Sequence, residues 1–279
     1  MSNALELRNV CKTYGDFSIE NLSFSLPRGC VMGLVGENGA GKSTTIHMLL
    51  GMVKPDSGEV RVLENPLDRN FDQIKQDIGV VLDEPGFPVQ LGAKQVDRIM
   101  AKTYRNWNSG LFQGYLRRFS LPEKKTVKEY SRGMKMKLGM AVAMSHGAKL
   151  LVLDEATAGL DPVIRDEILD ILFEFTRDPE CSVLMSSHIV SDLEKLCDYV
   201  AFLHEGRLLV CEEKDALLER YGLVHLTREQ LLNLDGVVLG KKETPYGLEA
   251  VVERERVREL PVRPITMEEL FVYMIKGGK

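Results

Sequence analysis

The sequence predicts an α/β fold built around a mostly parallel sheet. Short apolar runs alternate along the chain with stretches of helical periodicity, which is the pattern of repeated strand–helix units. The runs at residues 31–35, 150–153 and 183–185 are almost wholly apolar. Such runs are typical of strands that are covered on both faces. The chain of 279 residues can bury a sizeable core, as one large domain or two small ones.

The first part of the chain contains a strand, a turn and a helix in close succession. The strand at residues 31–35 leads through a glycine-rich turn to a helix at residues 42–52, which we expect to end near Gly51. Later, apolar runs at residues 199–203 and 208–211 flank a short polar segment. This arrangement predicts a hairpin.

A helical insertion interrupts the α/β pattern. Residues 93–104 and 111–119 have helical periodicity, and no strong strand lies between them. We therefore expect three parts: an α/β core at residues 1–84 and 131–212, a helical subdomain at 85–130, and a C-terminal extension at 213–279.

The C-terminal extension is predicted to be small and of mixed structure. A short helix at residues 215–221 should stop at Gly222. Capping boxes that begin at Thr227 and Thr266 each open a further helix, the second ending before Gly277. The other expected features are a hairpin of residues 237–239 and 248–252 and a solvated charged face at residues 253–259.

The composition excludes several classes of protein. Apolar residues make up 44% and charged residues 28%, which excludes a mainly disordered chain, a collagen-like repeat and a membrane-spanning bundle. The net charge of −5 gives no general attraction to nucleic acid, and we expect no nucleic-acid partner. The N-terminus lacks the pattern of a signal peptide, and the five cysteines form no C-x-x-C pair. These features favour a cytoplasmic protein with reduced thiols.

Residues 36–43, Gly-Glu-Asn-Gly-Ala-Gly-Lys-Ser, fit the phosphate-binding pattern G-x-x-x-x-G-K-[ST]. Glycines let the backbone curl so that N–H groups point at phosphate oxygens, and the following helix adds its positive end. Lys42 would reach the β- and γ-phosphates, and the Ser43 hydroxyl would bind Mg²⁺. A chance match is the alternative, and the strand before and helix after argue against it. The candidate nucleotide-binding residues are Gly36, Asn38, Gly39, Ala40, Gly41, Lys42, Ser43 and Thr44.

Two carboxylates follow the buried run at residues 150–153. Asp154 and Glu155 would lie at the carboxyl edge of the sheet, where ligands bind in open α/β folds. Asp154 could bind Mg²⁺, and Glu155 is placed to accept a proton from an attacking water. Such a pair alone is often a solvated strand end. Its presence in the same chain as the phosphate-binding motif favours an active site.

Two further segments become informative together with these motifs. His188 follows the strand at residues 183–185 and so reaches the same sheet edge, although a lone histidine is more often a surface residue. Residues 130–134, Tyr-Ser-Arg-Gly-Met, begin a helix that runs to Met144. Alone, this segment is an ordinary helix start with a serine near the cap.

The order of these motifs resembles the nucleotide-binding subunit of an ABC transporter. The resemblance covers residues 4–212 and includes Gly159-Leu160-Asp161 after the two carboxylates. It implies a P-loop NTPase core of ABC type with an N-terminal antiparallel β part, an inserted helical subdomain and a small α+β C-terminal extension. Residues 130–134 correspond to the signature segment of this family. Their sequence is similar to that of drug and peptide exporters whose membrane subunit is a separate chain.

The resemblance also implies roles for individual residues. Tyr14 would stack on adenine, and His188 would contact the γ-phosphate. The catalytic residues would be Glu155, His188 and Lys42. Ser131 and Gly133 would bind the γ-phosphate held by an opposite subunit. Asp161 would lie in the loop that crosses the interface between the two subunits.

The sequence departs from the usual family pattern at two places. The signature reads Tyr-Ser-Arg-Gly-Met rather than L-S-G-G-Q, so Arg132 stands where a glycine is usual. Asp83 stands where the family usually has a glutamine that senses Mg²⁺ and the membrane subunit. Asp83 is therefore a candidate metal ligand beside Ser43 and Asp154, or it points to solvent or to the membrane subunit.

The resemblance implies an ATP-hydrolysing subunit that uses ATP and Mg²⁺ to power transport. Its partners would be an integral membrane permease and a second ATP-binding subunit, identical or different, at the inner face of the plasma membrane. The alternative is a non-transport ABC ATPase that acts on nucleic acid or ribosomes. One phosphate loop and no long coiled-coil insert count against that alternative. The aromatic residues Phe87, Tyr104, Trp107 and Phe112 either contact the permease or pack inside the insert.

Overall fold

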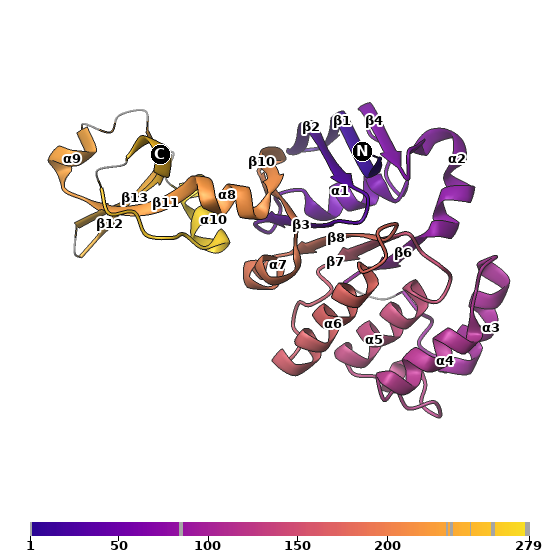
Figure 1. The fold of residues 1–279 in the computed structure, drawn as a ribbon. Coiled ribbons are helices and arrows are strands. Elements are labelled where there is room, and N and C mark those ends of the chain that lie inside the picture. Colours follow the sequence, from indigo (N-terminus) through magenta and orange to yellow (C-terminus); the bar gives the residue numbers. More distant parts are fainter. Residues whose placement is uncertain are drawn as a thin grey trace.

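The computed structural model describes residues 2–83, 86–232, 234, 237–245, 247–257 and 260–276. The described residues form three sheets with helices around them (Figure 1). Within this part of the chain, every helix falls short of the length or apolarity that a membrane span requires.

A six-stranded sheet forms the centre of the molecule. Its strand order is β10-β9-β3-β8-β7-β6, and all neighbours pair in parallel except the β9–β10 hairpin. The predicted α/β fold, the three apolar strands and the hairpin are thus confirmed. The strands are β3 (Val31–Gly36), β6 (Ile78–Val81), β7 (Leu150–Asp154), β8 (Ser182–Ser187), β9 (Tyr199–His204) and β10 (Arg207–Glu213).

An antiparallel sheet and helix α1 cover one face of the central sheet. Alternate residues of the central strands, such as Met32 and Leu34, pack into one core with these elements. The antiparallel order is β2-β1-β4-β5. The elements on this side are β1 (Asn3–Tyr14), β2 (Phe17–Pro27), α1 (Lys42–Leu49), β4 (Ser57–Val62), β5 (Asn65–Pro66), α2 (Leu67–Ile74) and the short 3₁₀ helix η1 (Lys75–Asp77).

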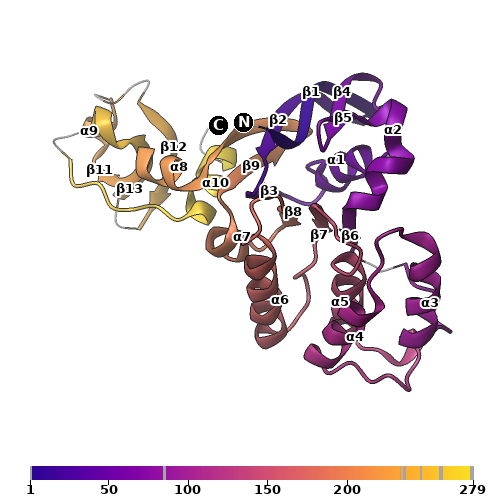
Figure 2. The ribbon, with the colours of Figure 1, turned by 45° about the vertical axis from the view of Figure 1, so that its right-hand side comes forward.

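Helices cover the opposite face, as the two views in Figures 1 and 2 show. The other set of alternate residues, including Val31 and Val35, packs against α5 (Arg132–Ala143), α6 (Pro162–Phe175) and α7 (Val190–Leu196). Coverage of both faces explains why the central strands are apolar throughout.

The helical insert contains α3 (Ala93–Thr103), α4 (Ser109–Arg118) and the 3₁₀ helix η2 (Val127–Glu129). Its aromatic residues pack inward, which resolves the alternatives left open by the sequence. Phe112 is fully buried, and the indole Nε1–H of Trp107 donates to Asp97 Oδ1 at 2.8 Å. The ring of Tyr104 stacks on His146, with 3.9 Å between the ring centroids. Phe87 packs, partly buried, against the same core.

The C-terminal part forms a three-stranded sheet, β11-β13-β12. Both predicted capping boxes are present, with Gln230 N–H donating to Thr227 Oγ1 and Glu269 N–H to Thr266 Oγ1, each at 3.2 Å. The predicted hairpin is also present, although its turn residue Tyr246 lies outside the described residues, as does Gly277. The elements are α8 (Lys214–Arg220), β11 (Tyr221–Leu226), α9 (Arg228–Leu232), β12 (Val238–Thr244), β13 (Gly247–Glu253), the 3₁₀ helix η3 (Arg254–Arg256) and α10 (Met267–Lys276).

One expectation for this part was wrong. Gly222 does not terminate a helix, because helix α8 already ends at Arg220 and Tyr221 begins strand β11. A Cβ at Gly222 would come within 2.2 Å of the Val262 side chain. The glycine therefore allows another segment to approach the strand closely. Helix α10 returns to the core, where Phe271 packs edge-on against Phe202 with 5.1 Å between ring centroids.

The packing of the insert leads to a first prediction. Phe112→Ala should lower the free energy of unfolding by about 3–5 kcal/mol, because it leaves a cavity in a close-packed site. The neighbouring Leu111 is 43% exposed, so Leu111→Ala should cost less than about 1 kcal/mol. Denaturant unfolding of both variants measures the difference, and equal costs would show that Phe112 does not anchor the insert.

Candidate active site

The glycine-rich segment forms a tight turn between β3 and α1. Gly39 and Gly41 have φ values of 82° and 107°, a region that favours glycine. Gly41 is the N-cap of α1, so no side chain caps that helix. The first N–H groups of α1 are therefore left for an anionic ligand, as the phosphate-binding motif requires.

Lys42 lies in the first turn of α1 and is almost completely buried, with 6% of its side chain exposed. Its ammonium donates to the carbonyl oxygens of Gly36 at 2.7 Å and Glu37 at 3.2 Å. It also forms an ion pair with Glu155, with 3.4 Å between Nζ and Oε1. A buried cation needs such partners, and a phosphate would provide stronger ones.

The end of strand β7 positions the two predicted carboxylates differently. Asp154 is buried, and its Oδ1 accepts a hydrogen bond of 2.6 Å from Ser186 Oγ on the neighbouring strand β8. The backbone N–H of Glu155 donates to the same Ser186 Oγ at 3.0 Å. Ser186 therefore orients both residues. Sequence reasoning did not single it out, and its only signal was a polar residue at the end of a strand expected to be apolar.

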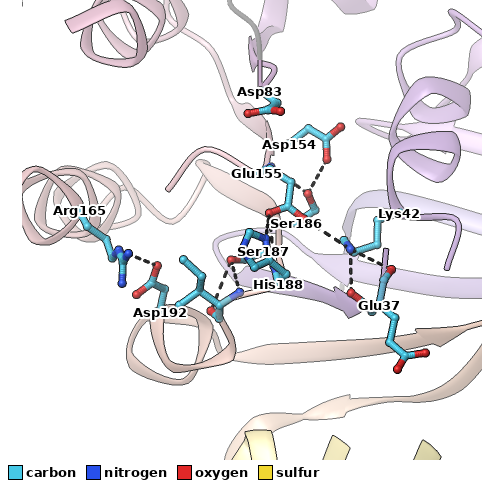
Figure 3. Close-up of polar contacts among 12 residues, drawn as sticks. Glu37, Lys42, Asp83, Asp154, Glu155, Arg165, Ser186, Ser187, His188 and Asp192 are labelled. Carbon is cyan, nitrogen blue, oxygen red and sulfur yellow. Dashed lines mark hydrogen bonds and ion pairs between the residues drawn. The ribbon is translucent and has the colours of Figure 1, made fainter. Parts of the chain in front are cut away.

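Glu155 has a left-handed backbone conformation, with φ of 52°. This conformation costs a non-glycine residue about 1–2 kcal/mol, so the surrounding contacts must hold it. The carboxylate lies between Lys42 and His188, whose Nδ1 is 2.6 Å from Glu155 Oε2 (Figure 3). Glu155 is 16% exposed and His188 is 52% exposed. The arrangement can accept a proton from a water molecule and share the resulting charge with its neighbours.

These residues surround an open cavity of about 650 Å³. The structure therefore brings together the phosphate loop, Glu155, His188 and Asp83. The lining residues are Phe17, Glu37, Asn38, Gly39, Gly41, Lys42, Ser43, Thr44, Asp83, Arg132, Glu155, Ala158, Gly159 and His188.

The aromatic residue on the cavity wall is Phe17, not Tyr14. Tyr14 is 44% exposed, and the ammonium of Lys12 lies 5.2 Å from its ring centroid. The two aromatic residues pair at the end of the β1–β2 hairpin. Sequence reasoning missed Phe17, although an aromatic residue three positions after Tyr14 was visible.

Ser131, Gly133 and Asp161 lie outside this cavity. Ser131 caps α5, with its Oγ accepting from the Met134 N–H at 3.2 Å. Asp161 caps α6, with its Oδ1 accepting from the Val163 and Ile164 N–H groups. A Cβ on buried Gly133 would come within 2.8 Å of the Ile164 side chain, so the two helix starts are closely packed.

The candidate metal ligands offer the oxygen atoms that Mg²⁺ prefers. Ser43 and Asp83 line the cavity, and Asp154 lies behind them against Ser186. Asp83 follows β6, and its Oδ1 accepts a hydrogen bond from the Arg132 guanidinium. Mg²⁺ commonly takes one or two protein oxygens together with substrate phosphates and water. A hydroxyl and carboxylates beside a phosphate loop fit that requirement.

Comparison with known proteins agrees with this geometry. Residues 19–158 match the family model described as "ABC transporter". The chain is 36% identical to the bacitracin transport ATP-binding protein BcrA of Bacillus licheniformis, over 75% of this chain and 69% of the relative. It is 34% identical to the lantibiotic transport ATP-binding protein SrtF of Streptococcus pyogenes, over 76% of this chain and 91% of the relative.

A solved structure described as the ATP-binding subunit of an ABC transporter has the same fold. The two superimpose with a TM-score of 0.70 at 25% identity, over 84% of this chain and 95% of the other. The resemblance inferred from the motifs, the P-loop NTPase fold and the transport-linked ATPase function are thereby confirmed. The chain belongs to the ATP-binding subunits of ABC transporters.

Proposed function

We propose that this subunit hydrolyses Mg²⁺–ATP in a two-chain assembly and powers export of a peptide antibiotic through a separate membrane permease. The observation that carries the catalytic part is the Glu155 carboxylate, held between Lys42 and His188 at the edge of a cavity lined by the phosphate loop. The assignment to peptide export is supported by the names of two relatives, which are a bacitracin and a lantibiotic transport protein.

Different residues of this chain have different roles in hydrolysis. Glu155 accepts the proton of the attacking water, and its contact with His188 keeps the carboxylate aimed into the cavity. Lys42 exchanges its carbonyl partners for phosphate oxygens and stabilises the charge that develops during transfer. Ser43, Asp154 and Asp83 would hold Mg²⁺, which would supply positive charge against the phosphates. Phe17 or Tyr14 stacks on the adenine ring.

A second ATP-binding subunit supplies the rest of the site. Ser131, Gly133 and Asp161 lie outside the chain's own cavity, at two helix starts that are packed together. An opposite chain would present these groups to the γ-phosphate. The cavity alone is open, and a second chain would exclude water from it.

The membrane permease docks on the helical insert, at the cytoplasmic side of the membrane. Three of the exposed large apolar side chains lie on this subdomain, namely Val89, Ile99 and Leu111, each 43–44% exposed. We assign residues 85–130 to this docking subdomain, residues 1–84 and 131–212 to the ATP-binding core, and residues 213–279 to a C-terminal extension.

Replacing Glu155 tests the catalytic assignment. Glu155→Gln keeps the shape of the side chain but removes its basicity, so the ATP turnover rate should fall by about 100- to 10,000-fold while ATP binding is retained. Glu37→Gln makes the same change at another carboxylate that lines the cavity, and it should keep nearly the wild-type rate. Wild-type turnover by Glu155→Gln would exclude Glu155 as the base.

The two-chain site can be tested by dilution. The specific ATPase activity should rise with protein concentration, because each cavity lacks its opposite wall until two chains meet. Ser131→Arg should abolish this activity and spare ATP binding by the single chain, since the long side chain would occupy the space of the opposite γ-phosphate. Ser131→Ala removes the α5 cap without adding bulk, and should lower activity less. Constant specific activity at all dilutions would contradict the assembly.

Export of peptide antibiotics can be tested in the host cell. Cells that carry Glu155→Gln in place of the wild-type subunit should become more sensitive to cyclic or lanthionine-containing peptides than to small aromatic drugs. Killing curves for both classes measure this. Unchanged sensitivity to every peptide would argue for another transported substrate.

A further inference from the structure

We propose that Arg132 is a positioning and charge-compensating residue of the ATP site, and that its pair with Asp83 sets the affinity for the nucleotide phosphates. The inference rests on the proposed binding of ATP in this cavity and does not require a second chain. It concerns two of the residues at which the sequence departs from the usual family pattern.

The two unusual residues meet in space. Arg132 begins helix α5 and donates from Nη2 to Asp83 Oδ1, at the end of strand β6. Arg132 and Asp83 are 50% and 53% exposed, and both line the cavity that holds Lys42 and Glu155. The guanidinium also lies against Gly159, where an added Cβ would be 2.9 Å from Arg132 Nη1.

The pair replaces two uncharged residues with two opposite charges. The usual family residues at these positions are a glutamine and a glycine, which together carry no charge. Asp83 and Arg132 also sum to zero, so the site has the same net charge with both residues as with two uncharged ones. A single replacement therefore changes the net charge that faces the phosphates, whereas a double replacement keeps it.

The charges on the cavity wall show how much depends on Arg132. Glu37, Asp83 and Glu155 bring three negative charges, while Lys42 and Arg132 bring two positive ones. With His188 counted as neutral, the described part of the wall carries one net negative charge. Removing only Arg132 would raise this to two, beside a ligand that is itself highly negative. Removing only Asp83 would reduce it to zero.

Local helix energetics do not explain an arginine at this position. Arg132 is the first residue of α5, where the helix dipole disfavours a cation. The first turn of this helix carries no acidic residue. A negative partner must offset the cost. Asp83 provides it while the cavity is empty, and the nucleotide phosphates lie within the same cavity once ATP binds.

An ion pair that acts on the phosphates and a merely structural one should differ in how replacing each partner changes the affinity for ATP. Without Mg²⁺, Arg132→Gln should weaken ATP binding by on the order of 3- to 10-fold, because Asp83 then faces the phosphates uncompensated. Asp83→Asn should strengthen ATP binding by a similar factor, because Arg132 becomes free to attract them. The double variant should bind within about 2-fold of the wild type.

Calorimetric titration of the full chain with ATP in the presence of EDTA measures all four dissociation constants. Repeating the titrations at high salt should shrink the differences, because these side chains are exposed to solvent. Thermal unfolding confirms that each variant is folded, which the exposure of both residues leads us to expect.

A matched ion pair outside the cavity provides the control. Arg118 and Glu174 are 42% and 47% exposed and form a two-point contact between α4 and α6. Arg118→Gln and Glu174→Gln should leave the affinity for ATP unchanged. These variants break a pair of similar exposure without altering the charge of the cavity wall.

The outcomes separate the inference from the proposed function. If both single variants shift the dissociation constant in the same direction, the pair is only a structural bridge and the inference is wrong. If wild type and all variants bind ATP equally well, Arg132 and Asp83 do not act on the phosphates. If the wild-type chain fails to bind ATP at all, the proposed function falls and the inference falls with it.

Discussion

The contact of the Glu155 carboxylate with Lys42 and His188 depends on how three parallel strands end. Strands β3, β7 and β8 are neighbours in the sheet, so their carboxyl ends meet although they are far apart in sequence. Apolar packing on both faces of the sheet fixes the register of these strands. Glu155 then leaves the sheet through a left-handed residue, which Ser186 holds by a hydrogen bond to its backbone. The left-handed conformation of Glu155 marks the point where the two adjacent carboxylates take different roles. Asp154 bonds to Ser186, whereas Glu155 contacts Lys42 and His188.

The phosphate loop and the strand-end carboxylates could be predicted because their chemistry depends on residues close in sequence. Gly41 must take a positive φ and Lys42 must follow it, wherever the rest of the chain lies. The aromatic residue that lines the cavity depends instead on the β1–β2 hairpin. Tyr14 and Phe17 are cross-strand partners there, and only the completed hairpin determines which ring reaches the cavity. The pairing of Asp83 with Arg132 was likewise beyond prediction, since the helical insert separates the two residues in the sequence.

Long-range packing also explains the difference in the C-terminal part. Gly222 after a short helix carries the local signal of a helix end, and α8 does end nearby. The residue nevertheless belongs to β11, because it pairs with Val252 of β13, thirty residues later in the chain. No local pattern reports that approach. By contrast, the capping boxes at Thr227 and Thr266 were reliable because each closes within four residues.

The start of helix α5 contributes residues to the cavity wall and to the surface outside the cavity. Ser131 and Gly133 lie outside the chain's own cavity, whereas Arg132 between them lines it. Adjacent residues on a helix point about 100° apart, so one turn can present groups in both directions. In the proposed two-chain assembly, any displacement of this helix start would therefore change both the charge facing the chain's own nucleotide and the groups offered to the opposite one. The helix packs on strand β6, which leads directly to Asp83. The ion pair thus joins the two segments that border the helical insert, and the charge at the phosphates depends on how that insert sits on the core.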